Sequence, residues 1–235
     1  MTDPVRDAMR VVYADGFRAG VDHALRRRAR RALVVFSGGL VVGALLAVLG
    51  IGAAVAQPIP VQANDHRRDL TRLSRSVWGM DAPISTLAAQ IHQESGWRAG
   101  AVSRVGAQGL SQFMPATAAG LARDFGDRPN PFDPRWSMLY QNRYMKQLYG
   151  RVEHAIDHCE RFAFALSAYN GGMRWVQRRQ SMSKLPQFCL FQTCDINPGI
   201  TAANQKENSD YPKKIIFRLT PIYHAAGWGP GVCLL

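Results

Sequence analysis

The chain of 235 residues carries a formal net charge of +12, and 47% of its residues are hydrophobic. That apolar content supports a folded core and excludes a chain too polar to fold, while the length allows one ordinary domain with additional segments. The excess of basic residues favours an anionic partner: nucleic acid, an anionic membrane surface or an acidic cell-wall polymer. Charge alone does not choose among these three.

The N-terminal part of the chain has the pattern of a membrane anchor. Residues 1–31 form a basic segment that ends in an arginine-rich run, and residues 32–56 contain no charged side chain. At about 1.5 Å per residue, a helix of this length crosses a hydrocarbon layer of about 30 Å. Because the arginines flank its N-terminal side, the positive-inside rule places the N-terminus in the cytoplasm. We therefore predict a single-pass inner-membrane protein whose main domain is periplasmic.

The same segment has two alternative interpretations. Ala54-Val55-Ala56 before Gln57 fits the small-residue pattern of a signal-peptide cleavage site. Eleven of the 25 residues from 32 to 56 are Gly or Ala, so the hydrophobicity per residue is modest. In this respect the segment resembles the signal-arrest-release segments of some phage endolysins, which leave the bilayer slowly and free the domain.

The rest of the chain is expected to form one compact, mainly helical domain. A linker at 57–64 contains two prolines, and the domain is placed at 65–235, with at most a small β-hairpin near 101–110. Asp81 is expected to cap the second helix, Pro83 to lie in its first turn, and Pro212 to lie in the first turn of the last helix. Helices are predicted at 69–78, 83–94, 131–148, 153–169 and 209–225, another helix is expected to begin at Pro115, and the segment 180–206 is expected to be irregular.

The cysteines indicate disulfide bonds if the domain is exported. The chain has four, Cys159, Cys189, Cys194 and Cys233, and no pair has CxxC spacing, which makes a zinc site a weak interpretation. Two disulfides with three possible connectivities are expected outside the cytoplasm, and four buried thiols in a reducing compartment. His154 and His158 beside Cys159 have a spacing common on helix faces, so no metal and no cofactor is predicted.

One carboxylate, Glu94, is the first candidate for a catalytic group. It closes a predicted apolar helix, and partial burial at the edge of a core raises the pKa of a carboxyl group, which suits a general acid at neutral pH. An isolated glutamate at a helix end is more commonly solvated. The glycine-rich stretch that follows, with Gly109, Gln112 and Met114, offers close backbone approach, an amide and a flexible apolar contact.

Three motifs in order resemble the soluble lytic transglycosylase family, whose α+β domain is related to goose-type lysozyme. They are E-S-G-W-x(5)-S-x-x-G-A-x-G-L-x-Q-F-M-P-x-T at 94–117, A-Y-N-G-G at 168–172 and E-N-S-D-Y at 207–211. The resemblance implies that Glu94 is the catalytic acid/base, that Ser103 hydrogen-bonds it, and that Glu207 is a supporting carboxylate. It also implies that the glycan cleft is lined by Gly109, Gln112, Met114, Tyr169 and Asn170. Pro212 and the long segment 180–206 depart from the family pattern.

The residue types also bear on mechanism. Most glycosidases use two carboxylates, yet the next acidic residue after Glu94 is Asp124, beyond the glycine-rich turn. A single-carboxylate mechanism therefore fits, and the resemblance implies cleavage between MurNAc and GlcNAc of peptidoglycan with formation of a 1,6-anhydro sugar. One alternative is a water-hydrolysing lysozyme of the same fold. Another is a wall-opening component of a secretion, conjugation or phage ejection apparatus. The expected partners are peptidoglycan strands, the inner membrane and components of a lysis or envelope-spanning complex, with no specific nucleic acid.

Overall fold

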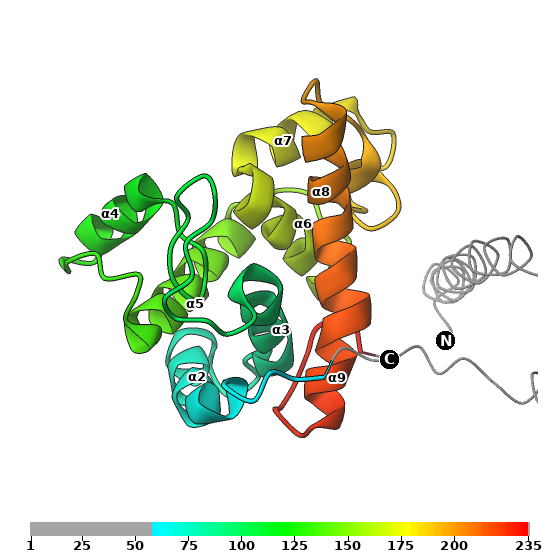
Figure 1. Ribbon diagram of the computed structural model, residues 1–235. Helices are drawn as coiled ribbons and strands as arrows, with labels where there is room; N and C mark the ends of the chain where they lie inside the picture. The colour runs from blue at the N-terminus through cyan, green and yellow to red at the C-terminus, as the bar shows by residue number, and fades with distance from the viewer. Residues whose placement is uncertain (1–57, 235) are drawn as a thin grey trace, which may run out of the picture. The chain divides into compact units, whose positions relative to one another are not determined.

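The computed structural model describes residues 58–234, and the predicted membrane segment at 32–56 lies outside this range. Within the described range no helix is both long and apolar enough to cross a membrane. The described helices, shown in Figure 1, are α2 (Ala63–Trp78), α3 (Ile84–Ser95), α4 (Pro115–Asp124), α5 (Pro134–Gly150), α6 (His158–Gly171), α7 (Met173–Met182), η1 (Thr193–Asp195), α8 (Ala202–Lys213), η2 (Lys214–Leu219) and α9 (Thr220–Ala225). The prediction of a mainly helical domain is confirmed for these residues.

Helix α3 is the buried centre of the domain. Every residue from Ile84 to Ile91 is buried, because the helix packs against α2, α9 and η2. In Figure 1 it lies between α4 on one side and α8 on the other. Its buried positions include the polar residues Ser85, Thr86 and Gln90 beside the apolar ones, so other elements must supply both packing and hydrogen-bond partners around it. Glu94, in its last turn, is thereby held at the edge of the core.

The start of α3 is capped by the C-terminal tail, not by Asp81 as predicted. The Ser85 amide donates to the Pro230 carbonyl at 2.8 Å, and the Ser85 hydroxyl donates to the Gly229 carbonyl at 2.7 Å. The first amides of a helix lack partners within the helix, and here a segment more than 140 residues away supplies one. The helix consequently begins at Ile84, one residue after Pro83.

Helix boundaries elsewhere differ from the predictions because caps decide them. Asp133 accepts from the Trp136 amide at 2.7 Å, so α5 begins at Pro134 and not at 131. Asp157 accepts from the Glu160 amide at 2.8 Å, so α6 begins at 158 and not at 153. Helix α2 begins inside the range expected to be a linker, and α7 was not predicted at all.

The predicted final helix at 209–225 is wrong in its start and its continuity. Thr201 caps α8, which therefore begins at 202, and Pro212 lies near its end, not in its first turn. A proline has no amide to donate and its ring crowds the carbonyl four residues before it. The π-helix η2 follows directly after α8, and α9 continues from it. A wider helical turn thus occurs just after the proline.

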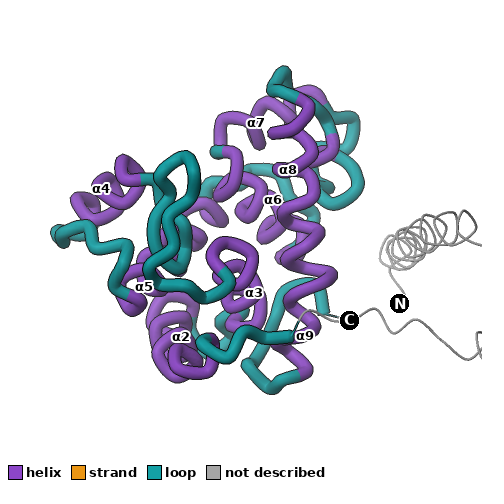
Figure 2. The backbone as a smooth tube through the Cα atoms, viewed as in Figure 1, coloured by secondary structure: helices purple, strands orange, loops and turns teal. Residues whose placement is uncertain are grey.

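The expected hairpin is reduced to bridges within an irregular loop. Val102 pairs with Gln108, and Gln108 pairs with Phe113, both in antiparallel orientation, and no longer strand forms in the described residues. Figure 2 shows this loop, which joins α3 to α4, beside the helices of the core.

The structure also has two disulfides, Cys159–Cys233 and Cys189–Cys194. This pairing is one of the three connectivities left open by the sequence.

Candidate active site

Glu94 is a half-buried carboxyl group with a raised pKa. It lies in the last turn of α3, and its Oε1 accepts a hydrogen bond from the Tyr211 hydroxyl. Burial raises its pKa to about 7, the Tyr211 hydrogen bond acts in the opposite direction, and the charge of Glu207 raises it further. At neutral pH such a group holds its proton in a large share of molecules and can also release it. Both directions of proton transfer are therefore available at one site.

Tyr211, from α8, is the hydrogen-bond partner of Glu94. Burial, and then the nearby charge of Glu94, raises the pKa of its hydroxyl well above the ordinary value. The hydroxyl therefore stays protonated and can donate. Sequence reasoning placed Tyr211 in the E-N-S-D-Y motif but assigned it no role, because the two residues are 117 positions apart. The motif itself was the signal that could have identified it.

Ser103 has a different partner from the one expected. Its hydroxyl oxygen accepts from the Ala107 amide at 2.9 Å, and its own amide donates to the Ala107 carbonyl at 2.9 Å. Both contacts close the turn between the two residues. In this structure Ser103 therefore shapes the loop after Glu94, while Tyr211 holds the carboxyl group.

Gln112 and Gly109 brace the same loop. The Gln112 side-chain amide donates to the Gly109 carbonyl at 2.9 Å and to the Ala101 carbonyl at 3.2 Å, so both hydrogens of its nitrogen are used within the loop. Gly109 has φ +76°, and a Cβ added there would lie 1.7 Å from the carbonyl oxygen of Pro131. Only glycine fits that approach. The loop therefore packs at Gly109 directly against the segment before α5.

Tyr169, near the end of α6, is bonded to this loop. Its hydroxyl donates to the Ser111 carbonyl at 2.7 Å, and its ring packs on Phe113 and Tyr144 at 5.9 and 5.4 Å between centroids. Burial raises the pKa of Tyr169, and the charge of Glu94 is the next cause, which places the two side chains in electrostatic range. Met114, 43% exposed, follows Phe113 on the same loop.

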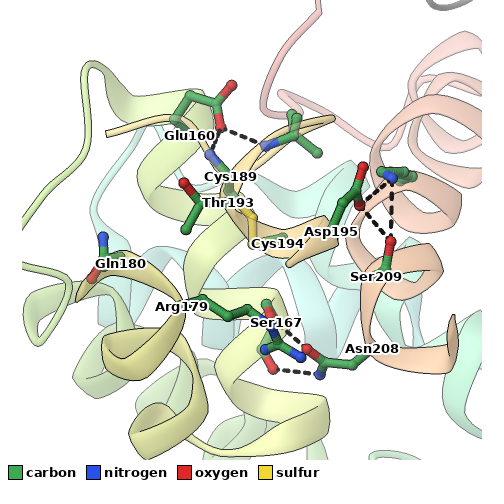
Figure 3. The surroundings of a disulfide bond; sticks show 12 residues. Glu160, Ser167, Arg179, Gln180, Cys189, Thr193, Cys194, Asp195, Asn208 and Ser209 are labelled. Carbon is green, nitrogen blue, oxygen red and sulfur yellow. Dashed lines mark hydrogen bonds and ion pairs between the residues drawn. A yellow bond between two sulfur atoms is a disulfide. The ribbon is translucent and has the colours of Figure 1, made fainter. Parts of the chain in front are cut away.

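Asn170 and Glu207 are held by a network between α6 and α8. The Asn170 amide nitrogen donates to Glu207 Oε1 at 3.1 Å, and the buried Asn208 amide donates to Asn170 Oδ1 at 2.9 Å. Figure 3 shows Asn208 also exchanging hydrogen bonds with Ser167. A Cβ at Gly171 would lie 2.4 Å from the Asn208 amide nitrogen, so a larger residue there would displace the Asn208 side chain from this network. The three sequence motifs thus come together in space, with Glu207 near enough to affect Glu94.

Part of the chain is similar to a known protein family. Residues 78–188 match the family model described as "Transglycosylase SLT domain". Residues 78–188 are therefore similar to this domain. The match covers the first two motifs, and the third motif lies after its end.

The chain is similar to proteins named membrane-bound lytic murein transglycosylase F. It is 41% identical to the one from Maricaulis maris over 87 residues, which are 37% of this chain and 18% of that protein. It is 30% identical to the one from Shewanella loihica over 167 residues, which are 71% of this chain and 32% of that protein. The chain therefore spans less than a third of the length of these relatives.

Solved structures show the same fold. The inactive mutant of the lytic transglycosylase Slt from Pseudomonas aeruginosa matches with a TM-score of 0.54 and 22% identity, covering 70% of this chain and 25% of that one. The 70-kDa soluble lytic transglycosylase from Escherichia coli matches with a TM-score of 0.50 and 22% identity, covering 68% and 24%. The lysozyme-like helical fold expected from the motifs is supported by these likenesses.

Proposed function

We propose that the chain is a peptidoglycan lytic transglycosylase with Glu94 as its acid and base. The observation that carries the proposal is a half-buried carboxyl group with a pKa of about 7, held by Tyr211 among the three motifs. The SLT domain match and the similarity to named murein transglycosylases support it. The net charge of +12 suits the anionic character of the cell wall.

The proposed reaction uses the substrate's own groups in place of a second carboxylate. Glu94 gives its proton to the oxygen between MurNAc C1 and GlcNAc, the C1–O bond breaks, and the acetamido oxygen of MurNAc bonds to C1. Glu94, now a carboxylate, takes the proton of the MurNAc 6-hydroxyl. The O6 atom then bonds to C1 as the acetamido oxygen leaves. The product is a 1,6-anhydro sugar, no water is consumed, and Glu94 regains its proton.

The other candidate residues have supporting roles in this proposal. Gln112 Oε1, Met114, Tyr169 and Asn170 line the glycan-binding surface beside Glu94, and Ser103 and Gly109 keep the loop in place. Glu207 supports the developing positive charge at C1. The tight packing of Gly109 on Pro131 indicates that it acts through the position of the loop and not through direct contact with sugar.

Hydrolysis by the same site is the second candidate, and one observation favours it. The charge of Glu207 reaches Glu94, so a second carboxylate is within electrostatic range of the acid. A hydrolase would place water between the two groups. Mass spectrometry of the products separates the two reactions, because a hydrated reducing end is heavier by one water than a 1,6-anhydro end.

The test of the proposed function is Glu94→Gln in the full chain. The variant keeps the shape of the side chain and removes its acid and base, so we expect it to fold and to lose at least about 100-fold in release of 1,6-anhydro muropeptides from purified peptidoglycan. Circular dichroism checks the fold. Activity at the level of the natural chain would rule out Glu94 as the catalytic group.

We also propose that the domain works in the periplasm, anchored by residues 32–56. The two disulfides suit an oxidising compartment outside the cytoplasm. Slow release of the anchor, as in the endolysin segments it resembles, and a role in lysis or in an envelope-spanning complex are further possibilities within this proposal. Fractionation of cells over time tests retention against release. Expression of the chain alone tests lysis, because a lysis enzyme kills the cell without partners.

A further inference from the structure

Behind Tyr211 lies a pair of buried amides that the proposed reaction does not use. Gln90 and Gln141, from α3 and α5, have no solvent exposure. The Gln141 nitrogen donates to Gln90 Oε1 at 2.8 Å, and the Gln90 nitrogen donates to the Tyr211 hydroxyl at 3.4 Å. The hydroxyl in turn donates to Glu94 Oε1. A continuous chain of hydrogen bonds therefore runs from the core to the candidate acid.

The direction of this chain is fixed by two groups that can only accept. The Gln141 nitrogen also donates to the Leu87 carbonyl at 3.1 Å, and the Gln90 nitrogen also contacts the Met145 thioether at 3.5 Å. A carbonyl or a thioether has no hydrogen to give. Turning either amide over would place two acceptors against each other. The amide nitrogen of Gln90 must therefore face the tyrosine oxygen.

This direction determines what the Tyr211 hydroxyl does. Its oxygen receives a hydrogen from Gln90, so its own hydrogen is directed to Glu94 Oε1. When Glu94 is protonated, Oε1 is already accepting, so the acid's proton is expected on Oε2. If the tyrosine could rotate, it could instead accept the proton of Glu94 and direct that proton away from the glycosidic oxygen.

The pair of glutamines also lowers the stability of the folded state. Gln141 Oε1 is buried and has no hydrogen-bond partner among the described residues. Burial of an unpaired carbonyl destabilises a protein, and two apolar side chains of similar size would fill the same space without that cost. Packing alone therefore does not explain two glutamines at this place.

We propose that Gln90 and Gln141 are positioning residues that fix the Tyr211 hydroxyl as a donor to Glu94, so that the acid presents its proton on Oε2. This inference rests on the proposed function of Glu94 for its catalytic consequence. The geometry on which it stands, three buried side chains and the half-buried Glu94 from three helices, is independent of the substrate.

The first experiment is a double-mutant cycle in the full chain with Gln90→Leu and Tyr211→Phe, assayed on soluble glycan strands. Gln90→Leu should lower kcat on the order of tenfold and leave KM unchanged, because it acts on the acid and not on sugar binding. The alkaline limb of the pH profile should move to higher pH, since the Tyr211 hydrogen bond lowers the pKa of Glu94. In the Tyr211→Phe background, Gln90→Leu should have no further effect on kcat or on the limb.

Two further variants separate positioning from loss of stability. Gln141→Leu should reproduce the shift of the alkaline limb, and it replaces Gln90→Leu if that variant does not fold. Gln180→Leu is the matched control, because Gln180 is also a buried amide, bonded to the His154 and Pro186 carbonyls, with no link to Glu94. Gln180→Leu should lower the stability of the protein and leave the alkaline limb of its pH profile unchanged.

A readout without turnover decides the inference even if the chain has no transglycosylase activity. Difference ¹³C NMR spectra against Glu94→Gln give the titration of the Glu94 carboxyl group, which should move upward in Gln90→Leu. An unchanged titration, or additive effects of Gln90→Leu and Tyr211→Phe on kcat, would overturn the positioning role. Failure of Glu94→Gln to lose activity would overturn the proposed function instead, with the NMR result still deciding the role of the amides.

Discussion

At the scale of single residues, the raised pKa that suits Glu94 to proton transfer also lowers the free energy of unfolding above pH 4.5. The folded chain raises its pKa from 4.5 to about 7, so between these values the native state holds a proton that the unfolded chain releases. The free energy of unfolding therefore falls as pH rises through this window. Glu94→Gln removes the penalty. We expect it to be more stable than the natural chain by on the order of 2 kcal/mol at pH 8, with the difference vanishing below pH 4.5. Thermal unfolding at both pH values measures it.

The control for this prediction is Glu153→Gln, which removes a carboxylate from an exposed position at the start of the segment before α6. Its stability should follow that of the natural chain at both pH values, because exposed substitutions have small effects. A Glu94→Gln chain that is no more stable at pH 8 would mean that the carboxyl group is ionised in the native state without cost.

The sequence identified the groups of the site but not all of their contacts. Glu94, Tyr169 and Asn170 could be named from motifs, because a motif records which residue types occur at which spacing. The partner of Glu94 could not, since Tyr211 reaches it only after α8 has packed in the fold. Ser103 was assigned to Glu94, and the bonds that the structure gives it are to the backbone of Ala107, so its bond to Glu94 stays a prediction.

At the scale of elements, the sequence predicted the existence of most helices and misjudged their ends. Periodicity reports the buried face of a helix, but its first residue depends on which group satisfies the free amides. For α3 that group is the Pro230 carbonyl, which no local pattern reveals. For α5 and α6 it is a local aspartate, Asp133 or Asp157, so these two starts could have been found.

The loop between α3 and α4 gives a prediction at this scale. Gly109→Ala adds a Cβ in left-handed backbone and against the Pro131 carbonyl, so we expect a loss of roughly 3 kcal/mol and a melting temperature lower by about 10 °C. Gly106→Ala is the matched control, since Gly106 has φ +88° and open space around the added atom, and it should lose only about 1 kcal/mol. Equal losses in the two variants would show that the approach to Pro131 does not restrict the loop. Activity should fall more in Gly109→Ala, because that loop holds Gln112.

At the scale of the whole molecule, one disulfide joins distant parts of the described chain and the other closes a short loop. Cys159–Cys233 spans 74 residues and fastens the tail that caps α3 to the start of α6. Cys189–Cys194 spans five residues in a loop whose Cys189 and Leu190 amides already donate to the buried Glu160 carboxylate, as Figure 3 shows for Cys189. A longer closed loop restricts the unfolded chain more. The two bonds should therefore differ in their contribution to stability.

Replacing each pair by serine tests this difference. Loss of the Cys159–Cys233 bond should cost roughly 4 kcal/mol and loss of the Cys189–Cys194 bond about 2 kcal/mol, measured by thermal unfolding of the full chain. The folded fraction of the first variant should keep its specific activity, because two hydrogen bonds still hold the tail on α3: the Ser85 hydroxyl donates to the Gly229 carbonyl, and the Thr86 hydroxyl accepts from the Val232 amide. A larger loss from the short bond would contradict the chain-entropy argument. It would mean instead that the 189–194 loop stabilises the native state directly, through its contacts with Glu160.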